Sequence, residues 1–265
     1  MCQVNGFFHE YIMSRPMEDN LFFSLEGHCS LNSQVVGQHL TIRNSWDRDI
    51  NVFESIDFSS LRSLTVFGEW RPFFISTNIN MRLVRVLDLE DTSNVTDDDL
   101  KDIGKLLPRL KFLSLRGRRG ITHLPKSLSC LRQLQTLDVR HTSITALPQA
   151  IIKLQKLQYI RAGTSKQPWN EGGRVTSLPT LDGQLNSRGV EVPAGIGKLR
   201  ALHTLGVVNV SGVGGKAIVM ELKTLSQLRR LGLCGINREN LKELCSAISG
   251  HSHLEYLSVE VDKDK

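Results

Sequence analysis

A glycine-rich stretch in front of a lysine is the first candidate for chemistry in this 265-residue chain. Residues 209–220 read NVSGVGGKAIVM. A phosphate-binding loop needs G-x-x-x-x-G-K-[ST], in which backbone N–H groups and the lysine hold phosphates and a hydroxyl group binds Mg²⁺. Val210 stands where the first glycine belongs and Ala217 replaces the hydroxyl residue, so the match is poor. We interpret the glycines as a flexible turn and Lys216 as a solvated charge near a helix start.

Metal and nucleophile motifs give no better candidate. The sequence has no H-E-x-x-H, no C-x-x-C and no G-x-S-x-G, which are the spacings that zinc sites and serine hydrolases use. The acidic stretch DTSNVTDDDLKD, residues 91–102, lacks the glycine and the final glutamate of a calcium loop. We expect a helix to begin there, with Asp97 to Asp99 near its N-terminus, where negative charge is favourable. The sequence predicts no enzyme, no metal and no cofactor bound by this chain.

Composition and charge describe an ordinary globular protein. The net charge is +6 and the pI is about 9.2, but 27 carboxylates dilute the basic residues. The tight basic cluster at residues 109–119 is interpreted as a solvated face followed by a turn, so no nucleic-acid partner is expected. No apolar run reaches the length of a membrane span, and the N-terminus lacks the pattern of a secretory signal. With five cysteines in no paired spacing, these features favour a cytoplasmic protein with reduced thiols.

A repeated sequence pattern indicates the structure that would position any site in this chain. The pattern L-x-x-L-x-L recurs at intervals of 23 to 26 residues, with one gap of 45, and this period is typical of leucine-rich repeats. In LKFLSLR, Leu113 and Leu115 are expected to point inward, and the residues between them outward. The copies begin at Leu61, Val84, Leu110, Leu134, Leu157, Leu202, Leu228 and Leu254, with a weaker copy at Gly37.

A second apolar ladder follows each of the clearest strands. Residues 120–134 and 143–157 both carry apolar side chains at matching positions, and Pro125 and Pro148 lie where the chain turns into a short helical return. Because one repeat cannot bury its leucines alone, the repeats must stack. The predicted fold is an α/β leucine-rich repeat solenoid, with a curved parallel sheet on the concave face and short helices and loops on the convex face.

The long gap between copies predicts an inserted loop at residues 164–189, rich in Gly, Ser and Asn. Loops of this length inside a compact array are often functional. Trp169 lies in this loop, and we expect it either to anchor the loop on the array or to contact a partner.

Three segments carry a resemblance to a known family. They are residues 84–117, 121–163 and 228–259, which begin VRVLDLEDTSN, ITHLPKSLSCL and LRRLGLCGINR. The chain resembles the leucine-rich repeat region of plant intracellular immune receptors, the coiled-coil nucleotide-binding type found in grasses. The resemblance divides the chain into a short helical N-terminal remnant of a winged-helix module, residues 1–36, and about nine leucine-rich repeats, residues 37–265.

The N-terminal part of this resemblance concerns nucleotide sensing. Members of the family usually carry a Met-His-Asp or Val-His-Asp triplet, whose histidine contacts bound ADP. The matching positions here are Val4, Asn5 and Gly6, so this triplet is degenerate. The resemblance places ADP or ATP only in a full-length receptor, and both ends of the chain suggest a fragment or a truncated gene product.

Side chains that point outward from the strands are the candidate binding site. Aromatic and arginine side chains are favoured anchors in protein interfaces. The resulting protein-interaction hypothesis rests on neighbouring residues Phe112, Arg116, Arg140, Tyr159 and Arg161. The alternative is a solvated sheet with incidental aromatic residues.

The resemblance implies a recognition and autoregulation module of an immune receptor. Its partners would be a pathogen effector or a guarded host protein, together with the nucleotide-binding module in cis. A second hypothesis is a cytoplasmic leucine-rich repeat adaptor without a nucleotide cycle. A third, a nucleotide-binding enzyme, would require the chain itself to bind ATP or ADP.

Overall fold

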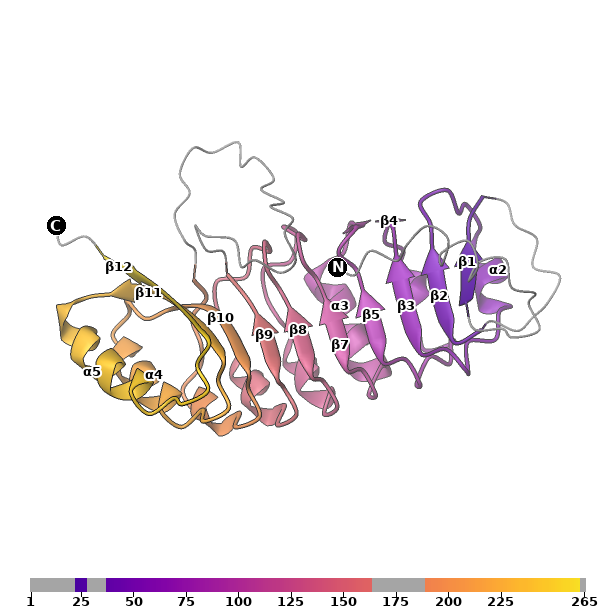
Figure 1. Cartoon of the computed structure of the whole chain (residues 1–265). Helices are drawn as coiled ribbons and strands as arrows, with labels where there is room; N and C mark the ends of the chain where they lie inside the picture. The colour runs from indigo at the N-terminus through magenta and orange to yellow at the C-terminus, as the bar shows by residue number, and fades with distance from the viewer. Residues whose placement is uncertain (1–21, 28–36, 164–188, 263–265) are drawn as a thin grey trace, which may run out of the picture.

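The computed structural model describes residues 22–27, 37–163 and 189–262. Its main feature is a parallel sheet of ten strands that follow one another in chain order (Figure 1). Each predicted copy of L-x-x-L-x-L supplies one strand of this sheet, which confirms the repeat. The strands are β1 (Phe22–Leu25), β2 (His39–Ile42), β3 (Ser63–Val66), β5 (Val86–Asp88), β7 (Phe112–Ser114), β8 (Thr136–Asp138), β9 (Tyr159–Arg161), β10 (Thr204–Asn209), β11 (Arg230–Ile236) and β12 (Tyr256–Val261).

Short helical segments return the chain on the other side of the sheet, so the described residues form a curved α/β solenoid (Figure 1). The small pair β4 (Gly68–Glu69) and β6 (Thr92–Ser93) lies beyond the ends of strands β3 and β5. The returns are α2 (Ile50–Glu54), η2 (Pro72–Phe74), α3 (Asp97–Leu106), η3 (Lys126–Cys130), η4 (Gln149–Lys153), η5 (Ile196–Lys198), α4 (Gly215–Leu222) and α5 (Arg238–Ile248).

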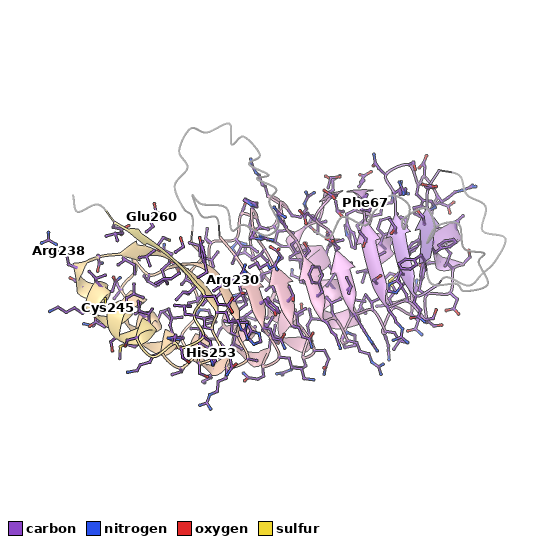
Figure 2. The ribbon with its side chains drawn as sticks, in the orientation of Figure 1. Phe67, Arg230, Arg238, Cys245, His253 and Glu260 are labelled. Atoms are coloured by element: carbon purple, nitrogen blue, oxygen red, sulfur yellow. The ribbon has the colours of Figure 1, made fainter. Side chains whose placement is uncertain are left out.

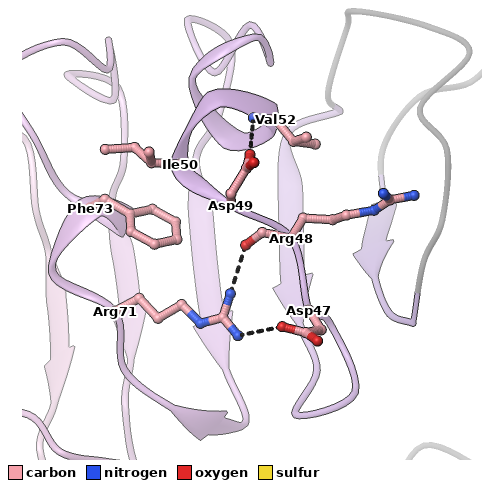
Figure 3. A pocket seen from close by; sticks show the side chains of 7 residues that line it. All are labelled: Asp47, Arg48, Asp49, Ile50, Val52, Arg71 and Phe73. Carbon is pink, nitrogen blue, oxygen red and sulfur yellow. Dashed lines mark hydrogen bonds and ion pairs between the residues drawn. The ribbon is translucent and has the colours of Figure 1, made fainter.

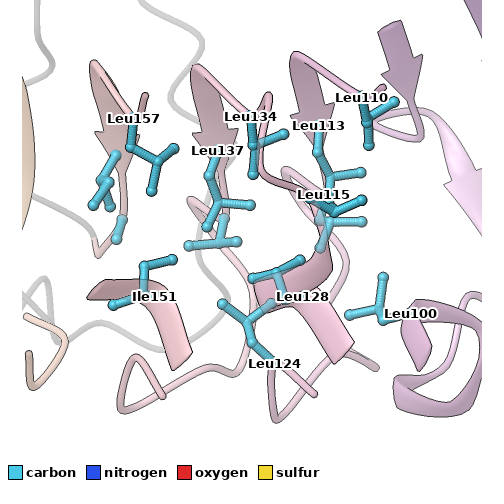
Figure 4. Packing of buried hydrophobic residues seen from close by; sticks show 14 of the residues in the cluster. Leu100, Leu110, Leu113, Leu115, Leu124, Leu128, Leu134, Leu137, Ile151 and Leu157 are labelled. Atoms are coloured by element: carbon cyan, nitrogen blue, oxygen red, sulfur yellow. The ribbon is translucent and has the colours of Figure 1, made fainter. Parts of the chain in front are cut away.

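The leucines of the repeat form one continuous core between the sheet and the returns (Figure 4). Leu113 and Leu115 are both fully buried, as the alternation predicts. The matching ladders of two successive returns are buried as well. Each fully buried aliphatic side chain contributes about 1.5 to 3 kcal/mol, so stacking of repeats supplies the stabilisation that a single repeat lacks. The ladder residues are Ile121, Leu124, Leu128 and Leu131, then Ile144, Leu147, Ile151 and Leu154.

Local sequence signals start the returns where they were expected. Pro125 and Pro148 precede the 3-10 segments η3 and η4 with φ of −72° and −71°, the value that the proline ring imposes. Thr96 caps α3, and its hydroxyl group accepts from the backbone of Asp99, whose carboxylate in turn accepts from the Thr96 N–H. This reciprocal pair is a capping box, and it confirms that the acidic stretch starts a helix.

Strand β1 was not predicted. It pairs in parallel with β2, Phe23 opposite Leu40, and Leu25 is fully buried. The repeat sheet therefore extends into the segment 1–36 that was assigned to a winged-helix remnant. The rest of that segment, residues 1–21 and 28–36, lies outside the described residues, and the remnant itself stays a prediction.

The C-terminal foot of the predicted insertion is fixed by backbone hydrogen bonds. The Val190 N–H donates to the carbonyl of Val207 (2.9 Å), and the Glu191 N–H donates to that of Thr145 (2.8 Å). Val190 thereby forms a bridge to Val208 in β10, while Glu191 forms a bridge to Ala146 in the preceding return. Residues 164–188 lie outside the described residues, but the chain re-joins the solenoid at a defined place.

Candidate functional site

The concave face of the sheet presents its side chains in rows, because parallel strands in register place equivalent residues side by side. Two rows lie on the strands and a third lies two residues beyond the second. The first row includes Val86, Phe112, Thr136, Tyr159, Thr204, Arg230 and Tyr256; the second includes Asp88, Ser114, Asp138 and Arg161; the third includes Glu90, Arg116 and Arg140.

Several aromatic side chains stand in the first row, and two of them, Phe112 and Tyr159, belong to the interaction hypothesis. Phe112 on β7 and Tyr159 on β9 are both half-buried, and Thr136 on β8 stands between them. Adjacent strands lie about 4.8 Å apart, so the two rings are roughly two strand spacings apart with a small residue between them. Figure 2 shows Arg230, which occupies the same row on β11.

The three arginines of the hypothesis lie against carboxylates of the same face. Arg116 Nη1 lies 3.1 Å from Glu90 Oε1 on the neighbouring repeat. Arg140 Nη2 lies 2.6 Å from Asp138 Oδ2, and Arg161 Nη1 lies 3.9 Å from the same oxygen. The arginines are therefore held in fixed orientations, which lowers the entropy lost when a partner binds.

Asp138 is the centre of this arrangement. It is only 5% exposed, and its Oδ1 accepts from the backbone N–H of Arg140 (3.1 Å) and from Arg140 Nε (3.0 Å). With Arg140 Nη2 on the other oxygen, the pair has the two-pronged geometry that gives strong, directional charge-assisted hydrogen bonds. A buried carboxylate thus keeps the guanidinium of Arg140 on the concave face.

Burial also changes the pKa values of two acidic residues on and after strand β5. The pKa of Asp88 is raised from its ordinary value chiefly because burial disfavours the charged carboxylate, and hydrogen bonds from Glu90 and Ser114 only partly oppose this. Burial likewise raises the pKa of Glu90, against the opposing charge of Arg116. The face therefore combines partly desolvated acids with arginines at fixed positions.

The structure brings together all five residues of the main hypothesis. Phe112, Arg116, Arg140, Tyr159 and Arg161 lie on three adjacent strands or directly after them, and we call them the concave cluster. Whether they bind a partner stays a prediction. Trp169 and the triplet Val4, Asn5 and Gly6 lie outside the described residues.

The hypothesis left out the carboxylates that hold these arginines. Asp88 and Asp138 occupy equivalent positions in VLDLED and TLDVRH, and a charged residue, Glu90 or Arg140, follows each two positions later. That repeated pattern could have indicated a charged ladder. The pairing of Arg116 with Glu90 joins residues of different repeats and has no local signal.

A hollow lies beside α2 (Figure 3). It has a volume of about 700 Å³ and is lined by Asp47, Arg48, Asp49, Ile50, Val52, Arg71 and Phe73. Arg71 donates to the carbonyl groups of Arg48 (2.7 Å) and Trp46 (3.3 Å), and its guanidinium lies 5.5 Å from the ring centre of Trp46. These contacts give Arg71 a structural role in joining two repeats.

The glycine-rich stretch at residues 209–220 is structural. The Gly215 N–H donates to the carbonyl of Gly212 (2.8 Å), and a Cβ added to Gly215 would collide with the carbonyl oxygen of Val210. Lys216, which was interpreted as a solvated charge near a helix start, has a side chain that is 63% exposed, and it also forms an ion pair with Glu243 of α5 at 2.7 Å. The stretch ends one repeat and starts helix α4.

Within residues 22–27, 37–163 and 189–262, no group of three or more His, Cys, Asp or Glu side chains is placed to hold a metal ion. In the same part of the chain, no helix combines the length and apolar character needed to cross a membrane.

A parallel sheet with one strand per repeat and short returns defines the class of the protein as a leucine-rich repeat solenoid. The family model for the leucine-rich repeat region matches residues 60–265. The chain therefore belongs to the leucine-rich repeat family.

Curated relatives include disease resistance proteins of rice, Oryza sativa subsp. japonica. Pik-2 is 28% identical over 282 residues, which cover 90% of this chain and 27% of that protein. RGA4 is 33% identical over 159 residues, which cover 60% of this chain and 15% of that protein. The chain thus spans about a quarter of the length of Pik-2, and the resemblance to plant disease resistance proteins is confirmed.

A solved leucine-rich repeat protein of Leptospira interrogans has 15% identity and a TM-score of 0.49, and the match covers 86% of this chain and 62% of that one.

Proposed function

We propose that this chain is the recognition part of an intracellular plant immune receptor and that the concave cluster binds a pathogen effector or a host protein modified by one. The disease resistance proteins among its relatives support the immune context. A broad repeat surface supports protein recognition, because solenoids present extended concave binding faces. The proposal places the chain in the cytoplasm and gives it no catalytic step.

The observation that carries this proposal is the juxtaposition of two aromatic rings and three oriented arginines on adjacent strands. Tyrosine and arginine are enriched among the residues that dominate interface energies. The arginines are only partly exposed, with side-chain exposures of 28% for Arg116, 22% for Arg140 and 31% for Arg161. A partner would complete their desolvation without having to order them first.

In a longer receptor, we propose that the same solenoid also docks on the nucleotide-binding module and restrains it. Such docking would let partner binding at the concave cluster compete with, or loosen, the restraint. ADP or ATP would then act in that module, and this chain would bind neither.

Proximity labelling in leaf cells challenged with a pathogen tests the proposal. The chain would carry a biotin ligase, and the labelled proteins would be compared between the wild type and Phe112→Ala/Tyr159→Ala. We expect specific partners to be lost in the variant, because each interface anchor contributes about 1 to 3 kcal/mol, or roughly a tenfold to hundredfold change in affinity.

A matched control removes apolar side chains from the convex face. Met220 on α4 and Leu241 on α5 are 47% and 45% exposed, so Met220→Ala/Leu241→Ala removes comparable exposed area without touching the concave cluster. Equal labelling by the wild type and the concave variant would contradict the proposal. Partners that are independent of pathogen challenge would favour the adaptor hypothesis instead.

A further inference from the structure

Five neighbouring turns on one edge of the solenoid carry basic side chains without interspersed acids. The turns that lead into strands β5, β7, β8, β9 and β10 are residues 79–85, 105–111, 129–135, 153–158 and 198–203. Together these turns contain ten lysines and arginines and no aspartate or glutamate, and all ten are exposed. We call these ten residues the basic edge: Arg82, Arg85, Lys105, Arg109, Lys111, Arg132, Lys153, Lys156, Lys198 and Arg200.

The basic edge is the lower edge of the sheet in Figure 1, where the strands begin. Figure 2 labels His253 at the same edge, in the turn before β12. The opposite edge, where the strands end, differs because it mixes acids and bases, as in Asp88, Glu90 and Arg116. The same edge carries Asp57 before β3 and Glu255 before β12, so the uniform positive charge belongs to the five central turns.

The basic side chains find few carboxylates within the described part of the chain. Lys105 Nζ lies 3.6 Å from Asp102. Two others use neutral acceptors, since Arg132 Nη1 donates to the carbonyl of Lys153 (3.0 Å) and Lys156 Nζ donates to Gln133 Oε1 (2.6 Å). These neutral contacts hold the side chains along the edge and leave their charge uncompensated.

Geometry makes the charges act together. Strands β5, β7, β8, β9 and β10 are neighbours in the sheet, and neighbouring strands lie about 4.8 Å apart. The Debye length at physiological salt is about 8 Å, so the spacing between neighbouring strands is shorter than one screening length. The edge spans about 20 Å, which an extended peptide of about six residues would cover.

The surroundings of the basic edge favour one class of partner. The five turns contain no Phe, Tyr or Trp, and such aromatic residues are what single-stranded nucleic acids stack on. None of the exposed large apolar side chains of the described residues lies in these turns, so nothing is available to insert into a membrane. The edge does continue directly into the concave cluster, because Lys111 precedes Phe112 and Gln158 precedes Tyr159.

We propose that the basic edge binds an acidic segment of the protein that the concave cluster recognises. This inference rests on the proposed function and adds the chemical class of the partner surface: aspartate and glutamate side chains along an extended stretch. Attraction between such charges raises the association rate and selects against basic partners.

Fluorescence anisotropy with a dye-labelled polyglutamate peptide tests the inference on the whole chain. We expect binding that weakens about tenfold or more between 50 and 500 mM NaCl, since the contacts are exposed and screened. Lys111→Glu/Lys156→Glu should abolish this binding. The control, Lys126→Glu/Lys242→Glu, changes the net charge by the same amount at exposed positions of η3 and α5, and it should bind like the wild type.

Thermal unfolding of both variants verifies that they fold. Equal loss of peptide binding in the two variants would show an effect of net charge alone and overturn the inference. Binding of duplex DNA or of phosphatidylserine vesicles as tightly as the peptide would also overturn it, in favour of a general polyanion surface.

The two proposals fail separately. If polyglutamate binding depends on Lys111 and Lys156 while no partner depends on Phe112 and Tyr159, the basic edge stands and the proposed function falls. If partners depend on the two aromatic residues but retain full affinity for Lys111→Glu/Lys156→Glu, the concave cluster stands and the acidic segment is excluded.

Discussion

The buried carboxylate of Asp138 organises the concave cluster at the scale of single residues. It orients Arg140 with both oxygens and lies near Arg161 from the next strand. The sequence predicts correctly that Phe112, Arg116 and Arg140 leave the strands on the same face, because alternation along a strand fixes direction. It does not predict the ion pairs, because those depend on distances between side chains of different repeats.

Removing this carboxylate should destabilise the protein. Asp138→Ala would remove the buried carboxylate that accepts hydrogen bonds from Arg140 Nε and Nη2, at a cost of about 2 kcal/mol or more in the free energy of unfolding. Urea denaturation measures this cost. Asp91→Ala is the control, because Asp91 is exposed and such surface changes usually stay within about 0.5 kcal/mol. Equal stability of the two variants would contradict a central role for Asp138.

The raised pKa of Asp88 predicts a specific pH dependence. An aspartate has a pKa of about 3.9 in an unfolded chain, so between that pH and the raised pKa the folded state binds the proton more strongly. Stability from this group is therefore lost as pH rises through that window. Asp88→Asn removes the titration, and its stability relative to the wild type should increase from pH 4 to pH 7 in urea denaturation.

The contribution of Asp97 to stability should change with pH in the opposite direction. Although burial raises its pKa, hydrogen bonds from the Thr122 hydroxyl group and from the N–H groups of Thr122 and His123 lower the pKa overall. The stability that this group contributes is present above the unfolded pKa and lost as pH falls. Relative to the wild type, Asp97→Asn should therefore lose stability as pH rises from 3 to 6. The same trend in both variants would refute the assignment whose predicted sign it reverses.

At the scale of elements, the periodic leucine pattern was sufficient to predict nine of the ten strands of the main sheet, but it did not predict β1. The copies from Gly37 to Leu254 carry the repeat, and each yields a strand. The stretch FFSL of β1 is too short to show the pattern, although Leu25 is buried and pairs with Ile42, the last apolar position of the next copy. Strand β1 forms through pairing with β2, which is tertiary information that a local pattern lacks.

Two neighbouring glycines before and at the start of α4 allow a test of how tightly the turn into this helix is packed. Gly215→Ala should destabilise the protein by more than about 2 kcal/mol, because its Cβ would meet the backbone carbonyl of Val210, which cannot move without shifting β10. At Gly214 an added Cβ meets nothing within 4 Å, so Gly214→Ala should be neutral within about 0.5 kcal/mol. Thermal unfolding of the two variants makes the comparison. Similar melting temperatures would mean that the turn is loose, as the sequence alone suggested.

At the scale of the whole molecule, the contacts that stabilise the protein run from repeat to repeat along the solenoid. Each repeat contacts mainly its neighbours, so central leucines are covered from both sides. Leu137 on β8 is fully buried, whereas Leu257 on β12, at an equivalent inward position, is 36% exposed. Among the described strands, β12 pairs with β11 alone.

Truncating these two leucines should therefore have unequal effects. Leu137→Ala should cost about 3 to 5 kcal/mol, and Leu257→Ala less than about 1.5 kcal/mol because part of its surface already faces water. Urea denaturation measures the global loss. Hydrogen exchange should show that Leu257→Ala opens β12 and leaves β7 to β9 protected. Global unfolding by Leu257→Ala would show stronger coupling between repeats than a linear array allows.

The foot at Val190 and Glu191 also has a consequence for protein engineering. These two residues bond to the backbones of Val207 and Thr145, so the solenoid's spacing across this point is set by main-chain atoms. Gly163 and Gly189 mark the two sides of the junction. Foreign sequences inserted between these two glycines should leave the sheet in register. The junction is therefore a suitable site for grafting new recognition loops beside the concave cluster.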